Sequence, residues 1–220
     1  MILAAGEGRR MLPLTATIPK PLLEVHGKAL IEWHLVRLAQ AGFTEVVVNL
    51  HHLGEKIRSR LGDGRVFGLD IRYSIEVNLL ETAGGIHHAL ELLGGVSSDE
   101  PFVVVNGDIY TDFDFSLLPK QLDGRVASLL MVDNPLHHPL GDFSLDAEGL
   151  LGMGSERLTY SGIGVYSPSL FRGLPGGAMR LRTLFEPAIA ASLLAGQYYA
   201  GRWTDVGTPE RLATLNATHI

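Results

Sequence analysis

The first stretch of the chain holds residues suited to binding a polyphosphate. A short apolar run ends at Ala5 and breaks into a loop with glycines at Gly6 and Gly8. Glycine in such a loop lets a ligand approach the main chain, whose free N–H groups suit phosphate oxygens. Arg10 and Lys20 follow and add positive charge, and arginine can hold a phosphate through two parallel hydrogen bonds. The stretch therefore predicts a loop that holds phosphate groups.

This loop is neither of the two common phosphate-binding loops. The dinucleotide fingerprint needs a third glycine where this chain has Met11, and the other loop needs Gly-Lys-Ser or Gly-Lys-Thr, which does not occur. On the glycines alone, a plain strand-to-loop turn with surface arginines remains the alternative.

Two aspartates suit a divalent cation. Asp108 directly follows the apolar run at 102–106, and Asp205 lies shortly before the last expected helix. Magnesium prefers oxygen ligands and is commonly held by one or two carboxylates, substrate phosphates and water. Each aspartate alone is better explained as a helix cap or a turn residue. Beside a phosphate loop, however, the pair indicates a Mg²⁺ site.

The elements that position these residues alternate between strands and helices. Continuous or alternating apolar runs predict strands at 45–49, 71–75, 102–106, 127–132, 142–145 and 160–165. Helical spacing predicts helices at 30–41, 53–61, 82–93, 184–195 and 208–217, with Thr82 as an N-cap and Pro209 in the first turn of the last helix. We expect an α/β fold with a Rossmann-like, mostly parallel sheet and helices on both faces. Residues 1–220 should form one domain whose later strands make a small acceptor-side lobe.

Composition limits the class of protein. The chain has 220 residues, 46% hydrophobic and 19% charged, with a net charge of −6 and no cysteine. This balance argues against nucleic-acid binding, and the missing cysteines exclude disulfides and thiol catalysis. The sequence contains neither an apolar run of about 18 residues nor a signal-peptide pattern, so we expect a cytoplasmic enzyme without membrane contact. The first strand is very short, which leaves open whether native residues precede Met1.

The whole opening string is more specific than its glycines. It reads Leu-Ala-Ala-Gly-x-Gly-x-Arg-Met-x-Pro-Leu-Thr over 3–15, followed by Pro-Lys-Pro-Leu over 19–22. This string resembles the opening signature of the sugar-phosphate nucleotidyltransferases, which join a nucleoside triphosphate to a sugar 1-phosphate and release pyrophosphate. The resemblance implies the nucleotide-diphospho-sugar transferase fold and these two substrates as partners.

The resemblance also implies roles for individual residues. Arg10 and Lys20 would be catalytic, and Asp108 and Asp205 would hold Mg²⁺. The nucleotide would be bound by Ala4, Ala5, Gly6, Gly8, Arg9, Arg10, Glu76, Thr82, Ala83 and Gly84. The sugar phosphate would be bound by Asn106, Gly141, Glu156 and Thr183.

One segment narrows the resemblance to a branch of the family. Residues 76–85 lie between a strand and a helix start, where free N–H groups and two glycines would face the nucleoside. The segment is similar to the family's Leu-Gly-Thr-Ala-Gly motif but has Glu81 in place of the first glycine. A Leu-Glu-Thr variant and the string Gly141–Phe143 resemble a branch that transfers uridylyl from UTP to N-acetylmuramic acid 1-phosphate during cell-wall sugar recycling.

Several alternatives remain open at this point. The reaction could use glucose 1-phosphate, mannose 1-phosphate or phosphocholine with dTTP, GTP or CTP, and the oligomeric state is not fixed. A non-catalytic nucleotide-sugar sensor is disfavoured because Arg10, Lys20, Asp108 and Asp205 are all present. Histidine pairs at 51–52, 87–88 and 137–138 lack the i, i+3 or i, i+4 spacing of helical zinc ligands, so we do not expect a zinc site.

Overall fold

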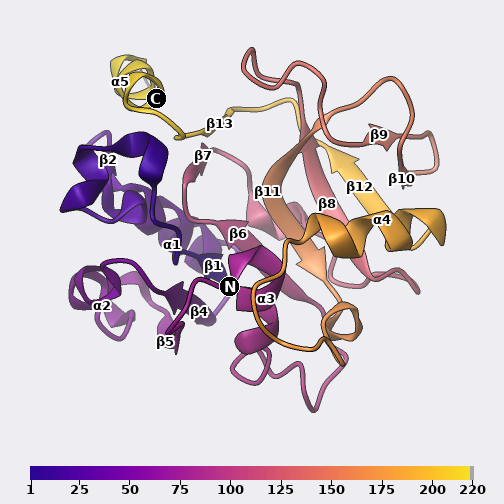
Figure 1. The fold of residues 1–220 in the computed structure, drawn as a ribbon, viewed down its shortest axis with the longest axis horizontal. Coiled ribbons are helices and arrows are strands. Elements are labelled where there is room, and N and C mark those ends of the chain that lie inside the picture. The colour runs from indigo at the N-terminus through magenta and orange to yellow at the C-terminus, as the bar shows by residue number, and fades with distance from the viewer. Residues whose placement is uncertain (219–220) are drawn as a thin grey trace.

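The fold is built on a seven-stranded sheet with the strand order β12-β8-β11-β6-β1-β4-β5 (Figure 1). The computed structural model describes residues 1–218. Strands β5, β4, β1 and β6 run parallel, β11 is antiparallel to both β6 and β8, and β12 is parallel to β8. The predicted mostly parallel α/β fold is therefore confirmed.

The bounds of the elements follow the sequence patterns over most of the chain. The helices of the described residues are α1 (Leu30–Gln40), α2 (Gly54–Leu61), α3 (Glu81–His88), α4 (Arg182–Ala190) and α5 (Pro209–Ala217). The strands of the main sheet are β1 (Ile2–Leu3), β4 (Glu45–Leu50), β5 (Asp70–Ile75), β6 (Phe102–Asn106), β8 (Ala127–Val132), β11 (Thr159–Tyr166) and β12 (Leu194–Tyr198). Three two-stranded ladders pair β2 (Glu24–Val25) with β3 (Lys28–Ala29), β7 (Ile109–Thr111) with β13 (Trp203–Asp205), and β9 (Ser144–Leu145) with β10 (Leu151–Gly152). Within residues 1–218, none of these helices is long and apolar enough to cross a membrane.

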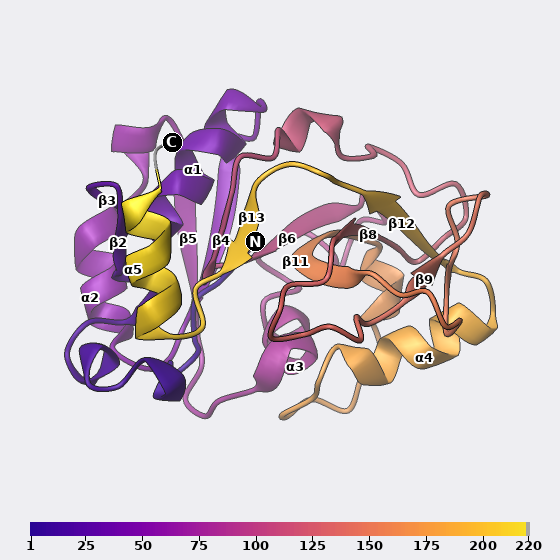
Figure 2. The ribbon, with the colours of Figure 1, turned by 90° about the horizontal axis from the view of Figure 1, so that it is seen from above.

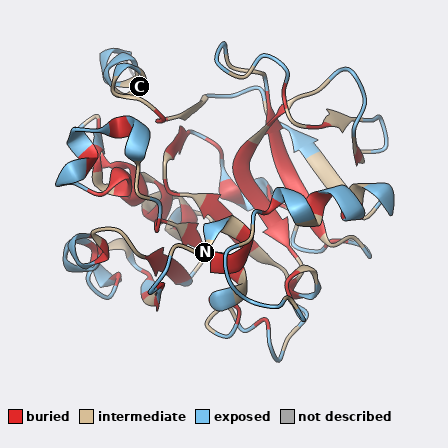
Figure 3. Ribbon diagram, viewed as in Figure 1, coloured by how far each residue is buried: buried red, intermediate tan, exposed pale blue. Residues whose placement is uncertain are grey.

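Alternate residues of the central strands supply two separate cores. In β6, Val103 and Val105 pack into the cluster that holds the apolar faces of α1 and α2, whereas Val104 packs on the other side with α3 and α4. A strand buried on both faces in this way reads as a continuous apolar run, which is how β6 appears in the sequence. Figure 2 shows α3 and α4 along one side of the sheet, and Figure 3 shows the buried strands between the helices.

Two predicted helices differ from the observed elements. The helix expected at 82–93 is α3, which begins at Glu81 and ends at His88, and Thr82 lies inside it rather than at the N-cap, which is Leu80. The prediction of a helix at 184–195 was wrong over its last turn. Here α4 ends at Ala190, Ser192 has a φ of 56°, and the apolar residues that follow enter the sheet as β12. A short apolar run is compatible with a buried strand as well as with a helix. Here the run forms a strand because it pairs with β8 at the edge of the sheet.

Candidate functional site

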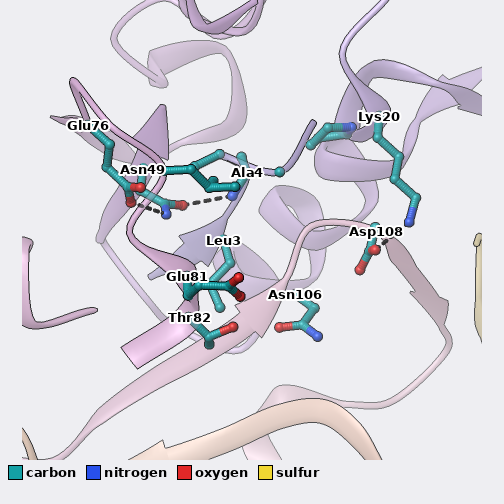
Figure 4. Close-up of a pocket in the computed structure, with 13 residues that line it drawn as sticks. Leu3, Ala4, Lys20, Asn49, Glu76, Glu81, Thr82, Asn106 and Asp108 are labelled. Atoms are coloured by element: carbon teal, nitrogen blue, oxygen red, sulfur yellow. Dashed lines mark hydrogen bonds and ion pairs between the residues drawn. The ribbon is translucent and has the colours of Figure 1, made fainter. Parts of the chain in front are cut away.

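A polar pocket lies at the carboxyl ends of the parallel strands β1, β4, β5 and β6, where ligands of such sheets collect (Figure 4). Its volume is about 230 Å³. The lining residues are Leu3, Ala4, Ala5, Gly6, Lys20, Pro21, Asn49, Glu76, Leu79, Glu81, Thr82, Asn106 and Asp108. The phosphate loop, the end of β6 and the start of α3 therefore face one cavity.

One end of this pocket is built from a buried hydrogen-bond network. The Asn49 side chain accepts from the Ala4 N–H at 2.7 Å and donates to Glu76 Oε1 at 2.7 Å. The second carboxylate oxygen of Glu76 accepts from the Leu80 N–H at 3.2 Å. Asn49 and Glu76 are each only 3% exposed. Because buried polar groups are costly to leave unpaired, this network fixes the relative positions of β1, β4 and the start of α3.

The other end of the pocket carries opposite charges. Lys20 Nζ forms an ion pair with Asp108 Oδ2, and the Lys20 side chain is only 10% exposed while that of Asp108 is 37% exposed. The Gly107 N–H donates to the Leu3 carbonyl at 2.9 Å, which extends the pairing of β6 with β1 and places Asp108 beside the phosphate loop. A buried ammonium group and a more exposed carboxylate here suit a phosphate and a cation, respectively.

A histidine is buried on α1, which packs against β7 just past Asp108. His34 is 0% exposed, and burial, which disfavours the charged ring, lowers its pKa to about 4; the charge of Asp108 opposes this shift. His34 is therefore neutral near pH 7.

Asp205 reaches the neighbourhood of Asp108 through the ladder between β13 and β7. Asp205 lies opposite Ile109, and the Val206 N–H donates to the Asp108 carbonyl at 2.9 Å. Arg211 Nη1 is paired with Asp205 Oδ2, and it lies 2.9 Å from His137 Nε2. His137 Nε2 is also 2.9 Å from Asp205 Oδ1, but a nitrogen that accepts from arginine cannot donate to that oxygen. Asp205 Oδ1 is thus buried without a hydrogen-bond donor.

Comparison with known proteins agrees with this geometry. The model of a family described as "Nucleotidyl transferase" matches residues 1–135, which include the phosphate loop, Asn49, Glu76, α3 and Asp108. The chain belongs to the nucleotidyl transferase family. It is accordingly an enzyme of the nucleotidyltransferase class, as the resemblance in its opening string implied.

Relatives and solved structures extend the likeness over nearly the whole chain. The nucleotidyl transferase is 48% identical to an N-acetylmuramate alpha-1-phosphate uridylyltransferase from Neisseria meningitidis, over 99% of this chain and 96% of the relative. It is 34% identical to a protein of the same name from Caulobacter vibrioides, over 96% and 92% of the two chains. The fold matches a structure titled as a putative glucose-1-phosphate thymidylyltransferase from Bacillus anthracis, with a TM-score of 0.83, 22% identity, and 98% and 92% of the two chains covered.

Not all the residues expected around the nucleotide line the pocket of this nucleotidyl transferase. The residues that do are Ala4, Ala5, Gly6, Lys20, Glu76, Thr82, Asn106 and Asp108. A Cβ atom built on Gly6 would meet nothing within 4 Å, so space for a ligand lies beside it, and Gly8 has a φ of 64°. Arg9 and Arg10 are exposed and outside the lining, and Arg9 Nε pairs with Glu7 at 2.5 Å. Their phosphate contacts therefore remain predictions.

The start of α3 corrects one expectation. The N–H groups of Ala83 and Gly84, which were expected to face the nucleoside, donate to the Met179 carbonyl at 2.9 and 3.2 Å. The Met179 N–H in turn donates to the Leu80 carbonyl at 2.9 Å. A Cβ on Gly84 would lie 2.2 Å from the Gly177 carbonyl oxygen, so glycine is needed there for this close packing. These two amides hold the segment before α4 and are not free for a ligand.

The residues expected to bind the sugar are dispersed. Asn106 lines the pocket, but Gly141, Glu156 and Thr183 do not. Glu156 and Thr183 are exposed, and the Thr183 hydroxyl donates to the Arg180 carbonyl at 2.7 Å. Their contact with a sugar therefore stays a prediction.

Sequence reasoning missed the residue that joins the two halves of the network. Asn49 ends a run of buried β-branched residues in β4, and a lone amide in such a run was the available signal. The side chains of His137 and Arg211 were also missed beside Asp205, because His137 comes from a distant turn and no spacing rule pairs Arg211 in α5 with the end of β13.

Proposed function

We propose that this nucleotidyl transferase transfers uridylyl from UTP to N-acetylmuramic acid 1-phosphate, giving the nucleotide-sugar and pyrophosphate. The observation that carries the proposal is the 48% identity, over 99% of the chain, to a protein named for that reaction, joined to a pocket with polar and charged ends. A location in the cytoplasm and a role in cell-wall sugar recycling belong to the same proposal.

The residues of the pocket would carry the reaction by position and charge. The base would lie toward Asn49 and Glu76, and the phosphates toward Gly6 and Lys20. A phosphate oxygen of the sugar 1-phosphate attacks the α-phosphorus of the nucleotide. The bond between that phosphorus and the oxygen bridging the α- and β-phosphates breaks, and pyrophosphate leaves. Lys20 would stabilise the charge that builds on the α-phosphate, and Arg10, exposed at the loop, would hold the leaving pyrophosphate. The attacking oxygen is already ionised, so little proton transfer is needed.

Magnesium fits the carboxylates present. Asp205 ends β13, Asp108 directly precedes the strand β7 with which β13 pairs, and Asp205 Oδ1 is a buried oxygen without a donor. Two carboxylates, completed by phosphate oxygens and water, are a usual set of ligands for this ion. When bound, Mg²⁺ supplies neutralisation of phosphate charge and polarisation of the α-phosphate. Lys20 is paired with Asp108 and Arg211 with Asp205, so each of the two aspartates also has a cationic neighbour.

The test is pyrophosphate release with Mg²⁺, measured over four nucleoside triphosphates and several sugar 1-phosphates. We expect release with UTP and N-acetylmuramic acid 1-phosphate. The kcat/KM for glucose 1-phosphate and mannose 1-phosphate should be at least about tenfold lower, because these sugars would leave polar groups of the site without a hydrogen-bond partner. Faster release with another pair would replace the substrates but keep the reaction. Nucleotide binding without release for any pair would overturn the proposed activity.

A further inference from the structure

Glu81 presents an unpaired carboxylate to the pocket. It is exposed, lines the cavity, and within residues 1–218 its side chain has neither a hydrogen bond nor an ion pair. Figure 4 shows the carboxylate on the pocket side, among the side chains of Leu3, Thr82 and Asn106. The network at Asn49 and the ion pair at Asp108 do not involve it.

The backbone at this position does not favour glutamate. Glu81 has a φ of 58°, in the left-handed region that residues with a Cβ atom rarely adopt and that glycine adopts freely. Nothing in the packing requires a long side chain here, because the residue is exposed. A non-glycine residue held in this conformation beside a ligand pocket is a pointer to a role for the side chain.

The position of Glu81 within the pocket indicates which part of a nucleotide it faces. In Figure 4, Glu76 and Asn49 lie at one end of the pocket and Lys20 and Asp108 at the other, with Glu81 between them. A nucleotide with its base at the first end and its phosphates at the second has its ribose in the middle, because the ribose links the two. In that orientation the ribose hydroxyls would be the hydrogen-bond donors of the nucleotide nearest to Glu81.

The charge of the side chain supports the same assignment. An ionised carboxylate only accepts hydrogen bonds, and it repels phosphate groups. A sugar hydroxyl is a donor without charge and is therefore the partner that such a group suits. We propose that the Glu81 carboxylate accepts hydrogen bonds from sugar hydroxyls in the pocket and so makes the enzyme selective for a ribonucleotide. This inference rests on the proposed function, and the hydroxyls of the acceptor sugar are a second source of the same chemistry.

The experiment compares two variants with ligands that lack single hydroxyls. Glu81→Gln keeps the shape and removes the charge, and Glu81→Gly removes the side chain. Each is measured with UTP, 2′-deoxy-UTP and 3′-deoxy-UTP, and with sugar 1-phosphates that lack one hydroxyl. The readouts are kcat/KM for pyrophosphate release and, without acceptor, the Kd of each nucleotide by calorimetry. Glu91→Gln is the matched control, because Glu91 is exposed just beyond α3 and does not line this pocket.

We expect the unaltered enzyme to bind UTP at least about tenfold more tightly than the deoxynucleotide that lacks the contacted hydroxyl, because hydrogen bonds to charged groups are strong. In Glu81→Gly the ratio of the Kd of the deoxynucleotide to the Kd of UTP should fall to about three or less. The control variant should keep the ratio of the unaltered enzyme. Glu81→Gly should also keep or raise the Tm, since glycine accepts this backbone conformation, so lost selectivity would not reflect unfolding.

The outcomes separate the inference from the function on which it rests. If the ratio instead collapses for a deoxygenated acceptor sugar, the carboxylate binds hydroxyls of that sugar, and the selectivity for a ribonucleotide is overturned. If every ratio survives in both variants, the inference is overturned while pyrophosphate release shows that the proposed function holds. If no substrate pair releases pyrophosphate, the proposed function fails, and the Kd ratios still decide the role of Glu81.

Discussion

The two ends of the site are held in place by different kinds of interaction. At the base end, Ala4, Asn49 and Glu76 are joined by buried hydrogen bonds among residues that the sheet itself brings together. At the metal end, the side chains of Asp205, Arg211 and His137 are 23%, 20% and 39% exposed; Asp205 and Arg211 meet through charge, and His137 accepts from Arg211. The first arrangement is rigid before any ligand binds, whereas the second can exchange partners. Substitutions at the first end should therefore change stability, and those at the second should change metal binding and rate.

The largest effect is expected from Asp108→Asn. The amide can still accept a hydrogen bond from Lys20, but it is a poor ligand for a cation, so kcat should fall by about a thousandfold. The Tm should change little, because the Asp108 side chain is 37% exposed. Steady-state pyrophosphate release and thermal melting check both parts, with Asp70→Asn at the exposed first residue of β5 as the control. A large loss of Tm together with kcat would contradict the distinction between the two ends.

The next largest effect is the loss of stability expected from Asn49→Leu at the base end. Asn49→Leu leaves the Ala4 N–H and the Glu76 carboxylate buried without their partner, and the free energy of unfolding should fall by about 3 kcal/mol. The KM for UTP should rise, because the network no longer fixes the pocket. Chemical denaturation measures the first change, and Asn78→Leu at an exposed position is the control. Unchanged stability would show that this network is not what holds the base end.

The sequence predicts which edge of the sheet holds the site better than it predicts the contacts within either end. Strands β4 and β6 are continuous apolar runs, and parallel strands place their carboxyl ends at one edge, so Asp108 could be assigned to the site from pattern alone. The buried position of Glu76 and its partner Asn49 needed the structure, because pairing across strands depends on register.

The metal end and the second half of the chain depend on contacts between distant residues. His137, from a turn far earlier in the chain, lies against Arg211 and Asp205, and no local pattern encodes that approach. Local patterns also do not encode the Met179 carbonyl accepting hydrogen bonds from the amides at the start of α3. Nor do they encode the pairing of β12, whose apolar residues were predicted to continue a helix. Tertiary contacts decided all three.

A third effect tests the region next to Asp108, where α1 packs against β7. His34 is neutral when folded because burial lowers its pKa to about 4, but it takes up a proton near pH 6.5 when unfolded. The unfolded state then binds more protons below pH 6.5, so stability falls as the pH is lowered, by about 2 kcal/mol between pH 7 and pH 5. His34→Met should remove this pH dependence, and His88→Gln, at an exposed position, should not. Denaturation curves at the two pH values decide; equal slopes in all three proteins would refute the prediction.

The smallest effect should come from Arg211→Met, at the end where charges exchange partners. Arg211 and a metal ion compete for the Asp205 carboxylate, so removing the guanidinium should raise the affinity for Mg²⁺ in the presence of UTP by about threefold to tenfold. The free energy of unfolding should fall by only about 1 kcal/mol, as is usual for a partly exposed ion pair. Magnesium titrations of UTP binding test the first part and denaturation the second. A lower affinity would mean that Arg211 orients Asp205 for the metal, and the metal end would then be built in advance like the base end.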